Sequence, residues 1–125
     1  MSAEPLLWCR RDVGSLIVDV YLAPMKGKPL NGLLGLWDAD THAIHVAWEL
    51  PREAAEAVLL HELGHAGIFA SGAKIGDSDA DEESALSVVV GALYGALKRN
   101  AMVRFPVRPV TPHDRARVRK ARVNR

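Results

Sequence analysis

The spacing of apolar residues changes along the chain, and this change predicts strands in the first half and helices in the second. Residues 15–22 (SLIVDVYL) are rich in β-branched side chains and stop just before Pro24, which is typical of a strand. Two further apolar runs, residues 33–37 and 43–48, flank a short polar segment and predict a β-hairpin. Because side chains alternate between the faces of a strand, three apolar residues of the second run share one face, namely Ile44, Val46 and Trp48.

Two stretches of helix formers follow the hairpin. The first covers residues 52–70 and is closed by Gly72. The second is expected to be capped by Asp79 or Ser78 and to run to about Asn100. The expected fold class is therefore α+β, with a small three-stranded sheet packed on two helices.

The composition is that of one globular domain, since the chain has 125 residues, of which 49% are hydrophobic and 25% are charged. Its longest uncharged apolar stretch, residues 84–97, is shorter than the roughly 18 residues that a membrane span requires. No secretory signal is visible, and Cys9 is the only cysteine. We therefore expect a cytoplasmic protein that has no membrane span and no internal disulfide.

Charge is distributed unevenly along the sequence. Residues 1–100 contain 8 Lys or Arg against 14 Asp or Glu, a balance of −6, whereas residues 101–125 contain 8 against 1, a balance of +7. We divide the chain accordingly into a folded domain, residues 1–105, and a basic C-terminal tail, residues 106–125. The tail side chains that would contact nucleic acid or an acidic partner are Arg115, Arg117, Arg119, Lys120 and Arg122.

Candidate chemistry is concentrated in the first predicted helix, at His61-Glu62-Leu63-Gly64-His65. Residues four apart lie on the same face of a helix, so His61 and His65 can bind one metal ion. Zinc binds histidine nitrogens, and a catalytic zinc site keeps a position open for water. Glu62 lies beside the first ligand, where it can accept a proton from that water. This HExxH spacing predicts a metallopeptidase centre, and Gly64 would allow a strand or substrate to approach closely.

A third ligand is expected at the start of the second helix, where two carboxylates lie 17 and 18 residues beyond His65. One glutamate and two histidines form a known set of catalytic zinc ligands. The helix face that continues from Glu83 carries large apolar residues, whereas the face that continues from Glu82 carries mostly alanine. We therefore favour Glu83 as the ligand and keep Glu82 as the alternative. The other glutamate would interact favourably with the positive N-terminal end of the helix dipole.

Several other polar residues are weaker candidates. A histidine in the hairpin or the tail could contact substrate, although such histidines are more often structural; these are His42, His45 and His113. Tyr94 could donate a hydrogen bond to a developing oxyanion, or it could be a buried helix residue. Three aspartates between the helices alternate but lack the rest of a calcium-binding loop, and we expect them to be solvated: Asp77, Asp79 and Asp81.

The residues around the motif resemble a known family. Residues 59–66 (LLHELGHA), the pair Glu82-Glu83 and residues 92–100 (ALYGALKRN) are similar to small HExxH proteins of bacteriophage and prophage genomes. Those proteins look like minimal gluzincins related to the ImmA/IrrE-type metallopeptidases. The resemblance covers roughly residues 15–100.

This resemblance implies a zincin-like α+β domain with His61, His65 and a glutamate of the second helix as zinc ligands and Glu62 as the general base. It also implies that segment 43–48 is an edge strand above the active-site helix, where an extended peptide could bind by strand addition. Members with known roles cut regulatory proteins such as repressors.

These observations predict a zinc-dependent metallopeptidase, a hydrolase that cleaves a protein or peptide substrate in the cytoplasm (of the host cell if the chain is phage-encoded). A second hypothesis is a catalytically silent, zinc-containing binding protein that acts through its basic tail on a protein or nucleic-acid partner. Zinc is favoured by the expected ligands, although nickel, cobalt and manganese occupy similar sites.

Overall fold

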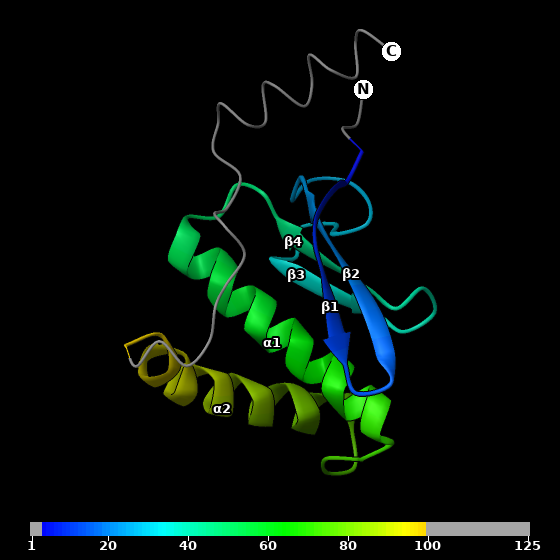
Figure 1. Ribbon diagram of the computed structural model, residues 1–125, viewed down its shortest axis with the longest axis vertical. Coiled ribbons are helices and arrows are strands. Elements are labelled where there is room, and N and C mark those ends of the chain that lie inside the picture. The colour runs from blue at the N-terminus through cyan, green and yellow to red at the C-terminus, as the bar shows by residue number, and fades with distance from the viewer. Residues whose placement is uncertain (1–3, 100–125) are drawn as a thin grey trace, which may run out of the picture.

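The computed structural model describes residues 4–99. Four strands, β1 (Leu6–Val13), β2 (Leu16–Ala23), β3 (Gly35–Asp38) and β4 (Ala43–Ala47), precede two helices, α1 (Arg52–Ser71) and α2 (Asp79–Arg99). The elements form three layers, with the sheet on one side of α1 and α2 on the other (Figure 1). The expected α+β class is confirmed, whereas the basic tail and His113 lie outside the described residues. Within residues 4–99, neither helix combines the length and apolar character that crossing a membrane requires.

The sheet is mixed, and its strands lie in the order β1-β2-β4-β3. β1 and β2 are antiparallel, β4 runs parallel to β2, and β3 is antiparallel to β4. The predicted strand and hairpin are confirmed, but the expected number of three strands is wrong because β1 adds a fourth. The expected edge position of segment 43–48 is also wrong, since β4 pairs with β2 on one side and with β3 on the other. The edge strand on that side is β3.

The additional strand β1 has a weak sequence signal. Charged Arg10 and Arg11 interrupt its apolar residues, and a bulge between Leu7 and Cys9 breaks its alternation. Gly14, with a φ of 58°, then allows a tight turn that returns the chain directly into β2. The strand therefore forms through its pairing with β2 more than through its own pattern.

The main core lies between the sheet and α1. The predicted shared face of β4 is confirmed, since its side chains and those of β2 that face α1 are almost fully buried: Val18, Val20, Leu22, Ile44, Val46 and the following Trp48. They pack on Ala55, Leu59 and Ala66 of α1. Burying one such large apolar side chain stabilises the fold by about 1.5–3 kcal/mol. This face therefore fixes α1, and with it the HExxH motif, against the sheet.

Both helices lie close to their predicted positions, α1 ending one residue later than expected and α2 being described as far as Arg99. After α1, Gly72 takes the left-handed conformation with a φ of 71°, which is typical of the residue that follows a helix. At the start of α2, the Ser78 hydroxyl oxygen accepts a hydrogen bond of 3.2 Å from the backbone N–H of Asp81. The Asp81 carboxylate accepts another, of 2.8 Å, from the backbone of Asp77. These exposed aspartates therefore stabilise the loop that orients the first turn of α2.

Candidate metal centre

The two histidines of the motif lie on the side of α1 that meets the first turn of α2. Their ring centroids are 5.0 Å apart. Glu83 of α2 places one carboxylate oxygen 2.8 Å from Nε2 of His61 and the other 2.8 Å from Nε2 of His65. One ligand atom from each of these three residues lies within 4.8 Å of the other two. The fold thus brings together both predicted histidines and the favoured glutamate.

His61 provides a test of whether this group fits a metal ion. Its Nε2 atom is buried and, within the described part of the chain, makes no hydrogen bond. The Glu83 oxygen lies 2.8 Å from this nitrogen, but the contact does not satisfy the geometry of a hydrogen bond. A buried ring nitrogen with such a poorly aligned contact is not fully satisfied, and a cation bound between the nitrogen and the carboxylate would satisfy both. Two imidazoles and one carboxylate also suit zinc, whose ligand atoms lie about 2.0–2.2 Å from the ion.

Glu82 occupies a different position from Glu83. Its Oε2 atom lies 2.6 Å from Nδ1 of His65, whereas Glu83 lies at the opposite ring nitrogen. An Nδ1–H that donates to a carboxylate fixes the orientation of the ring and leaves Nε2 for a metal. Both glutamates that the sequence left as alternatives are therefore at the site, with Glu83 between the Nε2 atoms of the two histidines and Glu82 at Nδ1 of His65.

The carboxylates and imidazoles of the group shift one another's pKa values. Burial lowers the pKa of His65, but the hydrogen bonds with Glu82 and Glu83 outweigh it and leave the pKa above its ordinary value. Burial likewise raises the pKa of Glu83, yet its hydrogen bond with His65 and the nearby His61 imidazole leave it below its ordinary value. The group therefore stabilises positive charge between the two helices, whether a proton or a metal ion carries it.

The expected general base, Glu62, is buried, with only 8% of its surface exposed. Burial raises its pKa, and the charges of His65 and His61, together with a backbone hydrogen bond from Trp37, offset this only in part. A carboxylate with a raised pKa is a better proton acceptor near neutral pH. A Cβ atom at Gly35 would lie 3.1 Å from Cγ of Glu62, so the glycine lets β3 lie directly against this side chain.

The edge strand β3 has backbone groups beside Glu62 that face away from β4. The backbone N–H of Ala47 donates a 2.9 Å hydrogen bond to the carbonyl oxygen of Leu34. Antiparallel pairs alternate between bonded and non-bonded positions, so the register directs the N–H and C=O groups of Gly35 and Trp37 away from β4. Trp37 uses its N–H for Glu62. The other outward groups are available to an added strand.

Two further candidate residues join the helices to each other. The Tyr94 hydroxyl, considered above as an oxyanion donor, donates a 2.7 Å hydrogen bond to the buried carboxylate of Glu56. Gly64 faces α2, because a Cβ atom there would lie 2.6 Å from Cδ2 of Leu86. The close approach that Gly64 allows is therefore that of a helix and not that of a strand or substrate. The sequence pattern indicated neither the Tyr94–Glu56 pair nor the role of Gly35.

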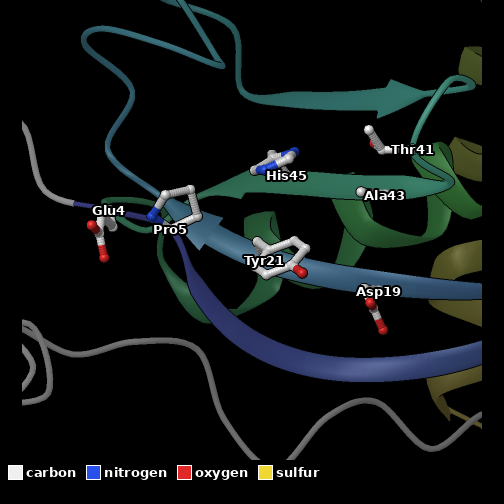
Figure 2. Close-up of a pocket in the computed structure, with 7 residues that line it drawn as sticks. All are labelled: Glu4, Pro5, Asp19, Tyr21, Thr41, Ala43 and His45. Atoms are coloured by element: carbon white, nitrogen blue, oxygen red, sulfur yellow. The ribbon is translucent and has the colours of Figure 1, made fainter.

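His45 lies on the outer face of the sheet, which faces away from α1. A hollow there of about 450 Å³ is lined by residues that include Asp19, Tyr21, Thr41 and His45 (Figure 2). The His45 ring stacks on Tyr21 with centroids 5.2 Å apart, and burial lowers its pKa. His45 is therefore separated by the sheet from His61 and His65, and the hollow is not part of the candidate metal centre.

No protein-family model matches this chain, and comparisons with curated proteins and with solved structures give no match. The fold and the site define the chain as a small α+β protein whose two helices bring together two histidines and a glutamate around a buried carboxylate.

Proposed function

We propose that this protein is a zinc-dependent metallopeptidase whose metal is held by His61, His65 and Glu83. The observation that carries the proposal is the convergence of these three residues, from two helices, with ligand atoms within 4.8 Å of one another. The HExxH spacing accounts for two ligands and a base. The third ligand comes from a separate helix, 18 residues further along the chain.

A zinc ion at this site supplies Lewis acidity, which polarises a peptide carbonyl and lowers the pKa of water. Glu62 accepts the proton of the attacking water and later donates it to the leaving amine. Its buried position suits both roles, because burial raises its pKa towards neutrality. Glu82 contributes indirectly, because its carboxylate accepts a hydrogen bond from Nδ1 of His65 and thereby fixes the orientation of that ring.

The substrate is an extended segment of a protein that pairs with the free edge of β3. The outward N–H and C=O of Gly35 and the outward C=O of Trp37 support this pairing, since they lie beside Glu62. Main-chain hydrogen bonds of this kind bind extended peptides with little regard to sequence. This arrangement replaces β4, the strand first expected to hold the substrate.

Elemental analysis of the purified chain tests the metal centre. We expect about one zinc per chain, lost in His61→Ala and in Glu83→Ala because each removes a ligand. Glu82→Ala should retain zinc but bind it about 10- to 100-fold more weakly, since it removes only the residue that orients His65. Glu53→Ala removes an exposed glutamate at the start of α1 and serves as the control. A chain that takes up no zinc when zinc is offered contradicts the proposal.

Glu62→Gln separates hydrolysis from metal binding. Glutamine has nearly the same shape but cannot accept the proton, so zinc content should be unchanged while hydrolysis of an unfolded protein such as casein falls roughly 100-fold or more. Glu53→Gln is the matched control and should retain full activity. Normal turnover in Glu62→Gln would rule out the role of this residue as the base.

A catalytically silent zinc-containing binding protein is the second candidate, and the segregation of charge favours it. Residues 101–125 carry a balance of +7, which suits nucleic acid or an acidic partner. In this case the zinc-loaded chain hydrolyses nothing and Glu62→Gln has no effect. Loss of the tail arginines would then abolish function.

A further inference from the structure

Three aromatic side chains form a cluster beside the candidate metal centre: Trp37 of β3, His42 of the following turn and Phe69 of α1. The rings of Trp37 and His42 are nearly parallel, at 11° and 6.1 Å between centroids. Phe69 meets Trp37 at 60° and 5.7 Å, and it meets His42 at 59° and 5.6 Å. These stacked and tilted contacts are the arrangements that aromatic rings prefer, so the three rings hold one another in place.

This aromatic cluster shares a helix face with the candidate metal centre. Phe69 follows His65 by four residues and Glu62 by seven, so all three side chains project from the same side of α1. With a rise of 1.5 Å per residue, Phe69 lies about 6 Å beyond His65 along the helix axis. From the sheet, the backbone of Trp37 bonds to Glu62, which places the other half of the cluster next to the general base.

The aromatic cluster is only partly covered. Phe69 is 47% exposed, and Trp37 and His42 are half-buried. Rings that served packing alone would be most stabilising if they were fully buried. What distinguishes these rings from other exposed apolar residues is that they touch one another and lie beside a polar site, so together they offer a contiguous apolar surface to a ligand.

We propose that Trp37, His42 and Phe69 form a subsite that receives a large aromatic or aliphatic side chain of the substrate. The inference rests on the proposed function and names the class of peptide that it acts on. A peptide extended along β3 advances about 3.3 Å per residue. Gly35 and Trp37 both lie beside Glu62, since a Cβ atom at Gly35 would lie 3.1 Å from Cγ of Glu62 and the Trp37 backbone bonds to its carboxylate. The preferred side chain therefore belongs to a residue within about two positions of the cleaved bond, on the side that faces the C-terminal end of β3.

Cleavage-site profiling of the zinc-loaded full chain tests this subsite. A mixture of peptides of diverse sequence is digested, and the cut positions are read by mass spectrometry. We expect Phe, Tyr, Trp or Leu to be enriched at one position within about two residues of the cleaved bond. Phe69→Ala should reduce this enrichment about tenfold, with unchanged zinc content. Phe69→Leu should restore much of it.

Ile17→Ala is the matched control, because Ile17 is also a large exposed apolar residue, at 63%, but lies in β2. It should leave the profile unchanged. An identical profile in wild type and Phe69→Ala, or a wild-type preference for Lys or Arg at that position, overturns the inference while leaving the proposed function intact. A zinc-loaded chain that cleaves no peptide overturns the proposed function and this inference with it.

Discussion

At the scale of single residues, His65 has a carboxylate at each ring nitrogen, Glu82 at Nδ1 and Glu83 at Nε2. A protonated imidazole donates from both nitrogens, so these two acceptors stabilise the charged form. Their effect outweighs burial and leaves the pKa of His65 above its ordinary value. Only an imidazole with a free ring nitrogen binds a metal, so a proton and zinc compete for Nε2.

This competition predicts a pH dependence of zinc binding. If the pKa of His65 had its ordinary value of 6.5, zinc affinity would rise with pH until just above 6.5 and then level off. Because the pKa is raised, zinc affinity should continue to rise at higher pH. Competition with a chromophoric chelator between about pH 5.5 and 8.5 measures this range. Glu82→Gln removes the largest interaction that raises the pKa of His65, so its curve should shift to lower pH. Affinity that is constant with pH would contradict the interpretation.

At the scale of elements, two glycines determine how closely β3, α1 and α2 approach. A Cβ atom at Gly35 would lie 2.4 Å from Cγ1 of Val58 on α1, and one at Gly64 would lie 2.6 Å from Cδ2 of Leu86 on α2. Both distances are far shorter than ordinary contacts between carbon atoms. Gly35 therefore lets β3 lie against Glu62, and Gly64 lets the first turn of α2, with its two glutamates, lie against the motif helix.

Gly35→Ala should consequently destabilise the protein and impair the site. Val58 is β-branched and stiff on a helix, so it cannot turn away from the new methyl group and β3 must shift. We expect a loss of about 1–3 kcal/mol in the free energy of unfolding, measured in denaturant. Hydrolysis should fall as well, whereas zinc should still bind because no expected ligand lies on β3.

Gly91→Ala is the control for this substitution, since nothing lies within 4 Å of the new Cβ atom on α2. Replacing an uncrowded helix glycine by alanine should stabilise the fold by up to about 1 kcal/mol. Equal stability of the Gly35→Ala variant and the wild type would show that β3 has room to move.

At the scale of the whole molecule, the candidate site needs all three layers. α1 supplies both histidines and the buried Glu62, α2 supplies Glu82 and Glu83, and β3 supplies the edge strand. Charge is also organised at this scale, because residues 1–100 have a balance of −6 and residues 101–125 a balance of +7. The chain therefore combines an acidic domain with a basic segment.

The basic segment predicts non-specific binding of the full chain to duplex DNA. Affinity should fall steeply as salt rises, because cationic side chains displace counterions from the phosphates. Fluorescence anisotropy from about 50 to 300 mM salt measures the dependence. Glutamine substitution of the five central cationic residues should abolish binding, and these are Arg115, Arg117, Arg119, Lys120 and Arg122. Glutamine at the exposed Lys26 and Lys28 should not affect it. Binding that is insensitive to salt would contradict the prediction.

The sequence by itself determined the elements whose signals are local. The β-branched run of β2, the polar turn between β3 and β4, and Gly72 after α1 each act through neighbouring residues, and all three are found as predicted. The spacing of His61 and His65 likewise follows from helix geometry alone. The sequence favours Glu83 over Glu82 as the ligand because large apolar residues follow Glu83 on the same helix face. Of these residues, Leu86 is buried, whereas Leu93 is 48% exposed.

Only the tertiary structure decided which elements meet and how closely. β1 lacks a clear pattern of its own, and the central place of β4 comes from parallel pairing between residues as distant as Asp19 and Ala43. The separate positions of Glu82 and Glu83 on His65 depend on the packing of α2 against Gly64. The physical reason is that periodicity reports which face of an element is apolar, but not which element covers that face or at what distance.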